Sequence, residues 1–537
     1  MTVPELSVGG QVRPAARPLA GAATAVSRRP DLVWGLPGLV ALVSALAWSW
    51  RPGYWADEDA TVSAVTRSAG QLFAMLGRTD AVHGVYDALL LPWAHLAGVS
   101  PFALRLPSAL AVAATAAGTA LIGRRVTRSA SAGLAAGLVF AVLPVVGGTG
   151  MEARSTALGA AAATWSTWAL LRALDGNGRR SRPWVGYALL SALACAVHLY
   201  CVLLLVAHLV TLTTTVATRR RAGGPPAGDR AGAGVLARWS VAAVVALAAA
   251  APVASTGWSQ RSQIDWLGHT TVRGLRSVPT SLWFSGSLPV ALVAWTLAIA
   301  GLVAWGRRSG TSRPVPGLLA LALPWAVLPP ALTWLVSLRE LSPGAGWYAP
   351  RYLFFALPAL ALVAGYGVTA LAARLPQGGR RFGVIGLVVL LALSGAGVQR
   401  ELRGPDGKGD DVLAVARTIR EHRQPGDAVL YRPVSRRLAA IGDPSGFAGL
   451  VDPGVGETPV QDDGLAGTGV DEATLVQRLG TVDRVWLVDR PGTEGAGPDV
   501  TVTDRALVAA HYRIASRYHP GRSELLLFVR RGSAAER

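Results

Sequence analysis

The sequence predicts an α-helical polytopic membrane protein with a smaller α/β domain at its C-terminus. Hydrophobic residues make up 51% of the 537 residues and charged residues only 15%, which is atypical of a soluble domain. Apolar runs of membrane-spanning length, about 20 residues each, recur from residue 32 to residue 399. After Arg400 these long runs stop, and mixed helix and strand patterns begin.

The formal net charge of +19 raises the question of a nucleic-acid partner. The arginines, however, stand in short clusters between the apolar runs, as expected when positive loops fix the orientation of a membrane protein. We therefore expect no nucleic acid as a partner, and we place the chain in the lipid bilayer of the plasma membrane. The two cysteines, Cys195 and Cys201, lie in apolar sequence, so no disulfide framework is indicated.

Residues 1–31 precede the first apolar run. Arginines are spread among Pro, Gly and Ala in this segment, and we expect a disordered cytoplasmic tail. A cleaved signal peptide is not expected, because the tail is long and the following apolar run lacks a small-residue cleavage site before Arg51.

Residues 32–399 are predicted to cross the membrane about eleven times. Arginine clusters mark the expected cytoplasmic turns at Arg124–Arg125, Arg179–Arg180, Arg219–Arg221, Arg307–Arg308 and Arg380–Arg381. The spans are expected at 32–50, 104–124, 129–148, 155–174, 183–199, 200–217, 236–254, 288–306, 315–337, 352–373 and 382–399. This order places the N-terminus in the cytoplasm and the C-terminus outside.

The apolar segment 85–99 is left out of this topology. As a further span it would invert all later turns, and the arginine pattern would then disagree with the threading. We expect it to be a helix that lies at the outer surface, within a long first outer loop formed by residues 51–103.

Residues 400–537 are predicted to form an α/β domain on the outer side of the membrane. Helices are expected at 410–423 and 504–511, and strands at 427–431, 482–488 and 525–529. The segment has the size of an ordinary domain, and it lacks the glycine signature of a phosphate or dinucleotide site. We expect this domain to assist rather than to catalyse.

The most informative residues follow the first span. Asp57, Glu58 and Asp59 form a run of acids in the first outer loop. Burying these charges in hydrocarbon would be costly, so we expect them to face a water-filled cavity at the membrane surface. Alternatively, they are the acidic first turn of a helix, which the following Ala-Thr-Val-Ser-Ala-Val pattern would accept. Capping and catalysis are compatible.

Other chemically active side chains collect at the outer ends of the spans, while the spans themselves are almost free of charge. They are Asp80, His83, Glu152, Arg154, His198, Tyr200, Arg351 and Tyr352. Asp80, His83 and Asp87 are spaced by three and four residues and would share one helix face. Each has a structural alternative. Glu152 and Arg154 would be interfacial charges, and the helix face with Asp80 would be solvated. His198 would be a hydrogen-bonded hairpin histidine, and Arg351 would snorkel to the membrane surface.

Such a set suits the transfer of a sugar from a lipid phosphate. One carboxylate takes the proton from the acceptor hydroxyl. The leaving phosphate is already an anion, and it needs only cations that hold its charge. In a single displacement the base and the leaving group lie on opposite faces of the sugar, so the anomeric centre inverts.

The chain resembles a known family in the order of four motifs along the sequence. They are Asp57-Glu58, Arg105-Leu106-Pro107-Ser108-Ala109-Leu110, Glu152-Ala153-Arg154 and Pro350-Arg351-Tyr352-Leu353. This order is similar to that of the multispanning glycosyltransferases that use polyprenyl-phosphate sugars, the GT-C fold. Within that fold it resembles family 39, the protein O-mannosyltransferase and aminoarabinose transferase group. The resemblance covers residues 1 to roughly 400.

The resemblance implies roles for residues of three of these motifs. Asp57 would be the catalytic base, and Glu58 would orient the acceptor or tune the acidic pair. Arg154 and Arg351 would hold the donor phosphate, and the other residues of the set would contact substrate. The donor would be a polyprenyl-phosphate sugar, with mannose expected, and the acceptor an envelope glycan, lipid or protein. The active site and the C-terminal domain would be extracytoplasmic.

Two departures from the family leave the acceptor open. No middle loop is long enough for the carbohydrate-binding-like insert of eukaryotic members. The terminal α/β domain instead resembles the tails of bacterial relatives of unassigned substrate. The Ala-, Gly- and Arg-rich composition suggests a bacterium of high GC content.

Two other functions are open on the sequence alone: a transporter or flippase of lipid-linked sugars, and an envelope scaffold protein. A transporter would carry charges or broken helices near the middle of the membrane, and a scaffold would not need about eleven spans. No cofactor is expected. Asp57, Glu58, Asp80, His83 and His198 could assemble a metal site, but no tight ligand spacing supports one, and we expect catalysis without a metal.

Overall fold

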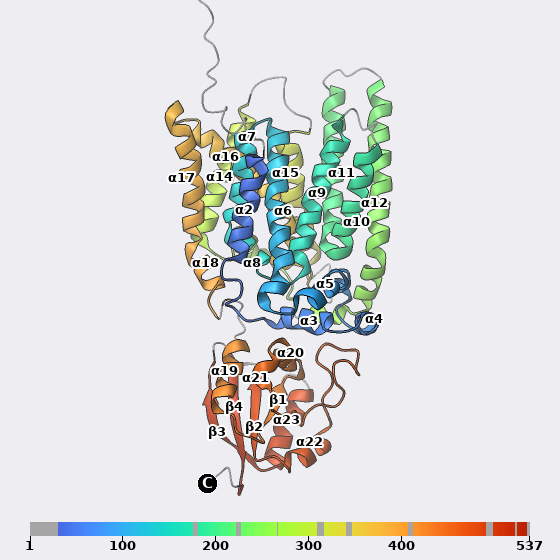
Figure 1. Cartoon of the computed structure of the whole chain (residues 1–537). Helices are drawn as coiled ribbons and strands as arrows, with labels where there is room; N and C mark the ends of the chain where they lie inside the picture. Colours follow the sequence, from blue (N-terminus) through green and yellow to red (C-terminus); the bar gives the residue numbers. More distant parts are fainter. Residues whose placement is uncertain are drawn as a thin grey trace, which may run out of the picture.

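A computed structural model shows two parts stacked end to end, a long helical bundle and a smaller domain with a β-sheet (Figure 1). The structure describes residues 31–175, 181–221, 227–265, 267–308, 316–339, 346–405, 407, 412–489, 498–520 and 523–533. The predicted tail, apart from Asp31, and the pair Arg179–Arg180 lie outside the described residues.

The bundle consists of long apolar helices, with short helices gathered at one end (Figure 1). The long helices and their continuations are α2 (Leu32–Leu46), α6 (Pro101–Thr127), α7 (Ala130–Val142), α8 (Pro144–Gly150), α9 (Ser155–Ala173), α10 (Ser181–Val197), α11 (Val202–Arg221), α12 (Ala227–Ser259), α14 (Leu288–Gly306), α15 (Leu318–Val336), α16 (Leu357–Ala372), α17 (Arg380–Ser394) and α18 (Ala396–Leu402). The short elements are α3 (Ala56–Val65), α4 (Ala69–Arg78), η1 (Ala81–His83), α5 (Gly84–Ala97), η3 (Leu199–Cys201), η4 (Arg261–Ile264), η5 (Val272–Arg276), α13 (Val278–Ser281), η6 (Pro350–Ala356) and η7 (Gln377–Gly379).

Each predicted span coincides with a helix, or with a helix and its continuation, in this bundle. Within the described residues, seven helices are long and apolar enough to cross a membrane, and eight if the bent pair α7 and α8 counts as one span. The helices α2 and α10 are shorter, with 15 and 17 residues. They nevertheless stand side by side with the longer helices, α2 against α6 and α10 against α9 and α12 (Figure 1).

One predicted span is broken. The sequence predicts a single helix at 129–148, whereas α7 and α8 are bent by 66° relative to each other. Pro144 opens α8, and Leu143 before it is extended, with φ −65° and ψ 133°. A proline donates no backbone hydrogen bond, and it disfavours helical angles at the preceding residue. The bend leads the chain into the turn that carries Glu152 and Arg154.

Small residues allow the bundle helices to approach closely, as is common in membranes. A Cβ atom at Gly301 in α14 would lie 2.1 Å from the carbonyl oxygen of Val363 in α16. One at Gly367 in α16 would lie 1.9 Å from the carbonyl oxygen of Leu297 in α14. The two helices therefore touch backbone to backbone, and α16 lies at the centre of the bundle, where most of its residues are buried.

The segment predicted to lie at the surface forms α5. This helix of 14 residues lies beside α3 and α4 at the end of the bundle (Figure 1). Its residues Tyr86, Leu90 and Ala94 pack with Val62 and Val65 of α3. The helix covers the ends of the spans and does not run alongside them.

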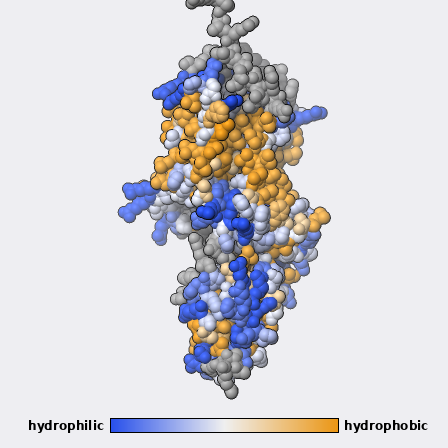
Figure 2. Space-filling view, turned by 60° about the vertical axis from the view of Figure 1, so that its left-hand side comes forward, coloured by the Kyte–Doolittle hydropathy of each residue, from blue (hydrophilic) through white to orange (hydrophobic). Residues whose placement is uncertain are grey.

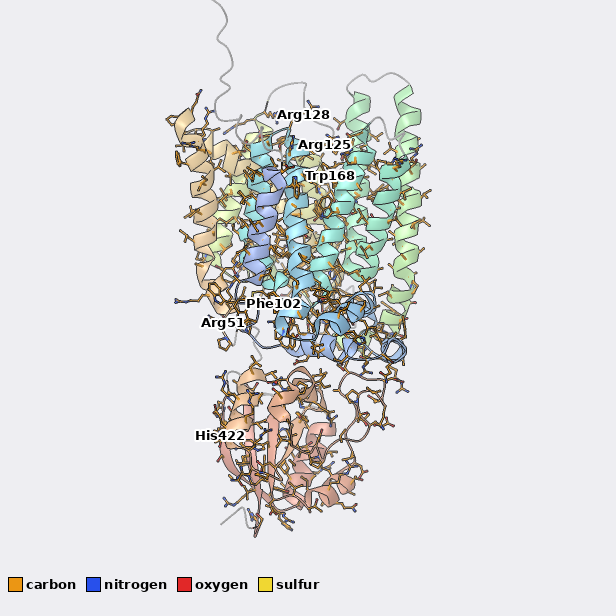
Figure 3. The ribbon with its side chains drawn as sticks, viewed as in Figure 1. Arg51, Phe102, Arg125, Arg128, Trp168 and His422 are labelled. Atoms are coloured by element: carbon orange, nitrogen blue, oxygen red, sulfur yellow. The ribbon has the colours of Figure 1, made fainter. Side chains whose placement is uncertain are left out.

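The two ends of the bundle differ in the arginines that they carry. Arg125 and Arg128 lie at one end, and Arg51 and Phe102 lie at the other, which faces the C-terminal domain (Figure 3). A broad belt of hydrophobic side chains lies between these ends (Figure 2). We call the end with Arg51 the site end. Its assignment to the outer side of the membrane stays a prediction.

The C-terminal domain has helices on both faces of a sheet. Among the described residues the sheet has four strands in the order β1-β2-β4-β3. β1 (Ala428–Arg432) pairs in parallel with β2 (Arg484–Asp489), while β4 (Glu524–Arg530) pairs antiparallel with β2 and with β3 (Tyr512–Tyr518). α19 (Val412–His422) and α21 (Pro444–Phe447) cover one face, and α22 (Glu472–Leu479) and α23 (Pro498–Ala509) the other. The short helix α20 (Leu438–Gly442) faces the bundle (Figure 1).

Three of these strands coincide with predicted strands, whereas β3 was not predicted. β3 lies at the edge of the sheet, and most of its residues are exposed or half-buried. Arg513 and Arg517 interrupt the apolar alternation that would identify a strand. Charges on an edge strand hinder pairing with other chains, so the feature that protects the edge also hides the strand.

Gly301→Leu is expected to destabilise the bundle, because its side chain would collide with the backbone of α16. Overpacking of this kind costs about 1–3 kcal/mol or more. Gly306→Leu on the same helix is the matched control, since a Cβ atom there meets nothing within 4 Å. Thermal unfolding of the purified full chain measures both variants. Equal unfolding midpoints would contradict the packing of α14 on α16.

Candidate active site

The three consecutive acids form the first turn of α3. Successive residues of an α-helix are rotated by about 100° around its axis, so the three side chains point to different neighbours. The carboxylates also lie at the positive end of the helix dipole. The acidic first turn considered from the sequence is therefore present, and the three acids divide between three environments.

Glu58 and Arg105 form a fully buried ion pair at the start of α6. Arg105 Nε donates to Glu58 Oε1 at 2.8 Å, and Nη2 donates to Oε2 at 2.6 Å. Neither side chain has exposed surface. The other bonds of the guanidinium go to the carbonyl oxygens of Ser49, Pro52 and Gly53. A paired, two-pronged contact of this kind is strong and directional.

This buried pair also fixes the turn after α8. Glu58 Oε1 accepts a hydrogen bond from the Ala153 backbone N–H at 2.9 Å. Thr61 Oγ1, one turn further along α3, donates to the Ala153 carbonyl oxygen at 3.0 Å. The N–H and the carbonyl oxygen of Ala153, the residue before Arg154, are thus both bound by side chains of α3.

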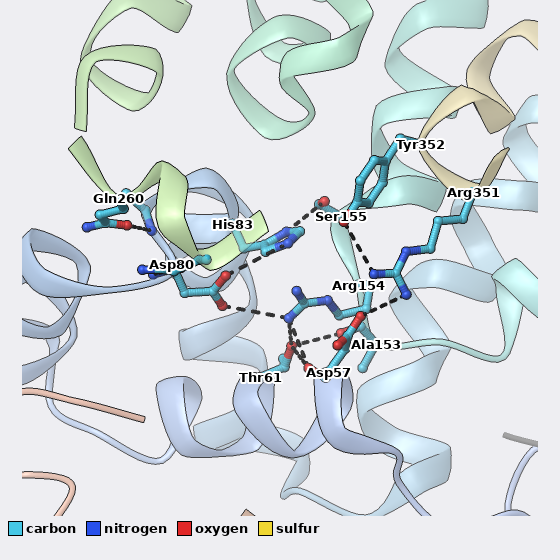
Figure 4. Close-up of polar contacts among 12 residues, drawn as sticks. Asp57, Thr61, Asp80, His83, Ala153, Arg154, Ser155, Gln260, Arg351 and Tyr352 are labelled. Carbon is cyan, nitrogen blue, oxygen red and sulfur yellow. Dashed lines mark hydrogen bonds and ion pairs between the residues drawn. The ribbon is translucent and has the colours of Figure 1, made fainter. Parts of the chain in front are cut away.

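The Arg154 guanidinium is held inside the site end, with a side chain that is only 10% exposed. Its Nη1 donates to the carbonyl oxygen of Asp57 at 2.9 Å and to Thr61 Oγ1 at 3.1 Å (Figure 4). The same atom lies 3.7 Å from Asp80 Oδ2. These contacts join Arg154 to the first turn of α3, and the contact of Arg154 with the donor phosphate stays a prediction.

Asp57 and Arg351 form the accessible part of the site. Arg351 Nη1 lies 3.2 Å from Asp57 Oδ2, and the two side chains are 39% and 32% exposed, respectively. The Arg351 guanidinium also lies over the rings of Trp55, at 5.3 Å, and Tyr352, at 5.1 Å. Figure 4 shows Asp57 and Arg351 facing each other from α3 and η6. Stacked aromatic faces stabilise the cation.

A cavity of about 290 Å³ lies beside this pair. Trp55, Glu152 and Arg351 line it, together with Trp283 from the loop before α14. Among the described lining residues, Arg351 supplies the cation and Glu152 the carboxylate. The volume is close to the lower limit of ligand pockets, about 300 Å³, so the cavity suits a small polar group.

Asp80 and His83 lie behind Arg154. Asp80 adopts a left-handed backbone conformation with φ 57°, and its N–H donates to Gln263 Oε1 at 3.2 Å. Its Oδ1 lies 3.8 Å from His83 Nε2, while His83 Nδ1 is 3.1 Å from Ser155 Oγ. Burial raises the pKa of Asp80 to about 6, although the charge of Arg154 opposes this shift. Burial, followed by the charge of Arg154, lowers the pKa of His83 well below its usual value.

Asp87, the third residue of the set with Asp80 and His83, lies in the protein interior. Its side chain is fully buried, and neither carboxylate oxygen has a hydrogen-bond partner among the described residues. Burial, reinforced by Asp80, raises the pKa of Asp87 well above its usual value. The prediction that Asp80, His83 and Asp87 share one helix face is therefore wrong, and so is the alternative of a solvated helix face. Asp80 precedes the 3-10 turn η1, and both aspartates are buried.

His198, Tyr200 and Tyr352 form an aromatic cluster. His198 Nε2 donates to the Tyr352 carbonyl oxygen at 2.8 Å, and the Tyr200 hydroxyl donates to the Trp347 carbonyl oxygen at 2.6 Å. The Tyr200 and Tyr352 rings lie 5.0 Å apart. These contacts tie the turn between α10 and α11 to the start of η6. The cluster thereby places Arg351 opposite Asp57.

The C-terminal domain contacts the far side of α3. Asp59 packs against Gly442 of α20, where a Cβ atom would lie 1.9 Å from Asp59 Oδ1. Ser63 Oγ donates to the Leu465 carbonyl oxygen at 2.9 Å. The guanidinium of Arg67 reaches the carbonyl oxygen of Gly464. The helix that presents Asp57 is therefore held between the bundle and the C-terminal domain.

Two positions of the site end were not predicted as site residues. Arg105 appears in the sequence only as part of a motif, yet a charged residue within an apolar span is a signal in its own right. Trp55, which lines the cavity, gives no such signal, since tryptophans are common at span ends. Within the described residues, no group of three His, Cys, Asp or Glu side chains could hold a metal ion.

One family model matches part of the chain. The family described as dolichyl-phosphate-mannose-protein mannosyltransferase matches residues 85–255. This stretch contains Glu152, Arg154 and His198 and ends before Arg351. None of the curated protein sequences matches the chain.

Solved structures share the fold. ArnT from Cupriavidus metallidurans, bound to undecaprenyl phosphate, aligns over 94% of this chain and 98% of its own, with 14% identity and a TM-score of 0.56. Its apo state gives the same values. The archaeal oligosaccharyltransferase AglB from Archaeoglobus fulgidus, in complex with an inhibitory peptide and a dolichol-phosphate, aligns over 94% of this chain and 74% of its own, with 10% identity and a TM-score of 0.49. The chain has the GT-C fold, and the resemblance to family 39 is confirmed.

Glu58→Gln is expected to lower the stability of the chain by about 3–5 kcal/mol, because it leaves the buried charge of Arg105 without its partner. The double variant Glu58→Leu with Arg105→Met removes both charges and should recover part of that loss. Thermal unfolding of the purified protein compares the three chains. A midpoint for Glu58→Gln equal to that of the wild type would rule out the Glu58–Arg105 ion pair as a source of stability.

The pH dependence of the unfolding midpoint tests the raised pKa of Asp80. Because its folded pKa of about 6 lies above the ordinary value of 3.8, the folded chain holds this proton more tightly than the unfolded chain does. The contribution of this proton to the free energy of unfolding is complete below about pH 4, and it is lost as the pH rises through about 6. Asp80→Asn cannot titrate, so its unfolding midpoint should fall less over this range.

Asp175→Asn, at the opposite end of the bundle, is the control and should keep the slope of the wild type. An unchanged slope in Asp80→Asn would contradict the assignment of this proton.

Proposed function

We propose that this GT-C membrane protein is an inverting glycosyltransferase. It transfers one sugar from a polyprenyl phosphate to an acceptor hydroxyl at the site end. The observation that carries the proposal is the Asp57–Arg351 pair beside a cavity of about 290 Å³. It brings an accessible carboxylate and a cation to the place where the membrane meets water.

Arg351 is the residue that we assign to the donor phosphate. Its guanidinium is half-exposed, and it borders the cavity. A phosphate is a strong, bidentate partner for arginine, and it would compete with Asp57 for the guanidinium. Donor binding would thus draw Arg351 from Asp57 and leave the carboxylate available to the acceptor.

Arg154 is assigned a positioning role in this reaction. It holds the backbone of Asp57 and the hydroxyl of Thr61, and its charge adds to the positive field near the leaving phosphate. Glu58 is likewise assigned to positioning. Its two oxygens are bound by Arg105 and Ala153 in the protein interior, where an acceptor hydroxyl has no access.

The reaction then follows as one displacement. Asp57 takes the proton from the acceptor hydroxyl, whose oxygen attacks the anomeric carbon of the donor sugar. The bond from that carbon to the phosphate oxygen breaks, and the polyprenyl phosphate leaves as an anion held by Arg351. Attack from the face opposite the leaving group inverts the anomeric centre.

Glu152 is a second candidate for the base, because it lines the cavity together with Arg351. Asp57 is favoured, since it lies in the motif on which the family resemblance depends and since it contacts Arg351 directly. Under this assignment Glu152 binds the hydroxyl groups of the donor sugar. The size of the cavity supports a single sugar as the transferred group.

Mannose is the sugar that we propose for the donor. The description of the matching family supports this choice. The polyprenyl-phosphate carrier is supported by the ArnT structure, which contains undecaprenyl phosphate. We propose an envelope glycan, lipid or protein as the acceptor, on the outer face of the plasma membrane. The C-terminal domain would stand on that face and hold α3 in place.

The proposed reaction is preferred to transport or to a scaffold function. The ionisable groups described above gather at the site end, whereas a transporter places them near the middle of the membrane. The break between α7 and α8 leads into the same end. A scaffold would require neither the buried pair nor the cavity.

Asp57→Asn should reduce transfer from radiolabelled polyprenyl-phosphate-mannose to a crude membrane acceptor fraction by about 10²–10⁴-fold, the usual contribution of a general base. The substitution keeps the size of the side chain, so the unfolding midpoint should stay close to that of the wild type. Glu152→Gln should raise the KM for the donor and retain most of kcat.

Asp175→Asn is the matched control and should retain full activity, because it lies far from the site end. Full activity in Asp57→Asn, with loss of kcat in Glu152→Gln, would transfer the role of base to Glu152. No transfer by the wild type from any polyprenyl-phosphate sugar would overturn the proposed function.

A further inference from the structure

A second, larger cavity lies on the flank of the bundle. It has a volume of about 1180 Å³ and shares no lining residue with the cavity beside Arg351. Ligand pockets usually measure about 300–1,000 Å³, so this space is large. We call it the flank groove. It is formed by residues of α2, α7, α17 and α18 and by the segment that follows α18.

The flank groove lies at the depth of one membrane leaflet. Leu39 and Val43 of α2 line it, and more than half of each side chain is exposed, as expected for residues that face lipid. From Leu39 to Ala47 a helix rises about 12 Å, which is close to half of the roughly 30 Å hydrocarbon core. The lower end of the groove coincides with the site end, where Arg51 lies (Figure 3).

Three arginines line the polar end of the flank groove: Arg51, Arg400 and Arg403. Arg403 is engaged, since its Nε donates to the Ala47 carbonyl oxygen at 3.0 Å and its Nη1 to the Gln399 carbonyl oxygen at 2.8 Å. The side chains of Arg51 and Arg400 make no hydrogen bond or ion pair with any residue that the structure describes. No described carboxylate lines the groove. Among the described lining residues, the charges at the polar end are therefore all positive.

α8 separates the flank groove from the cavity beside Arg351. On one side, a Cβ atom at Gly147 would lie 3.0 Å from Ser44 Oγ and 3.1 Å from Gln399 Oε1, and both of these residues line the groove. On the other, Gly148 lies against Leu402, which lines the cavity beside Arg351. A phosphate held at Arg51 and Arg400 would thus be a different phosphate from one held at Arg351.

We propose that the flank groove binds an anionic phospholipid. The acyl chains would lie along α2 and α17, and the phosphate would accept charge-assisted hydrogen bonds from Arg51 and Arg400. Basic pockets between membrane helices bind lipid headgroups in this manner. The bound lipid would stabilise the packing of α2 and α18 on α8. Because α8 lines the cavity beside Arg351, the lipid would also stabilise that cavity. The proposal does not depend on the proposed reaction.

Native mass spectrometry of the full chain in mild detergent tests this proposal, with phosphatidylglycerol and phosphatidylcholine as probes. Phosphatidylglycerol should bind more tightly. The double variant Arg51→Gln with Arg400→Gln should bind it roughly 30-fold more weakly, from about five- to sixfold for each charge removed near the membrane surface. Arg403 is left unchanged, because it holds the end of α2.

Two further variants separate the groove from general membrane charge. Arg380→Gln with Arg381→Gln removes two exposed arginines at the other end of α17 and should bind phosphatidylglycerol as the wild type does. Ala396→Phe places a bulky side chain in the groove and should lose the lipid with all arginines intact.

Three results would each overturn the proposal. They are equal retention of phosphatidylglycerol by the Arg51/Arg400 double variant, equal affinity for the two phospholipids, and displacement of phosphatidylglycerol by a lower concentration of undecaprenyl phosphate. The last result would assign the groove to the donor lipid. Unfolding midpoints measured in parallel show that the variants remain folded.

Discussion

The buried ion pair between Glu58 and Arg105 is the contact on which the arrangement of the site end depends. A charge without exposed surface must be paired and hydrogen-bonded where it stands, and the bonds of Arg105 leave little freedom to the segments around it. They fix the chain before α3, α3 itself and, through Glu58, the backbone before Arg154. This buried contact therefore determines the positions of the side chains that face the cavity.

The run of acids divides three tasks between adjacent residues. Glu58 points into the bundle, Asp59 packs on the C-terminal domain, and Asp57 is left at the accessible surface beside Arg351. A helical turn is the simplest way to send neighbouring side chains in different directions. The same geometry explains why a single run of acids can hold a helix in place and still present one accessible carboxylate. The buried contacts that hold α3 and the proposed chemistry therefore belong to different members of the run.

Much of the fold follows from local sequence patterns, whereas the roles within the site do not. Hydropathy and arginine clusters suffice to place the helices, because lipid imposes length and charge rules on each span separately. The motifs that hold Asp57, Glu58, Arg154 and Arg351 are also visible in the sequence and do come together. What the sequence does not contain is the direction of each side chain. The burial of Glu58 and Arg154 depends on contacts between segments almost a hundred residues apart, and the break at Pro144 depends on a single residue within an apolar run.

The configuration of the product is the most direct test of the account. A single displacement by an acceptor hydroxyl, with Asp57 as the base, requires that the anomeric centre of the sugar invert. The measurement is NMR analysis of the glycosidic linkage formed by the purified wild-type chain, compared with the linkage in the polyprenyl-phosphate donor. The account predicts opposite anomeric configurations in donor and product. Retention of configuration would require a covalent sugar–enzyme intermediate and would contradict the role assigned to Asp57.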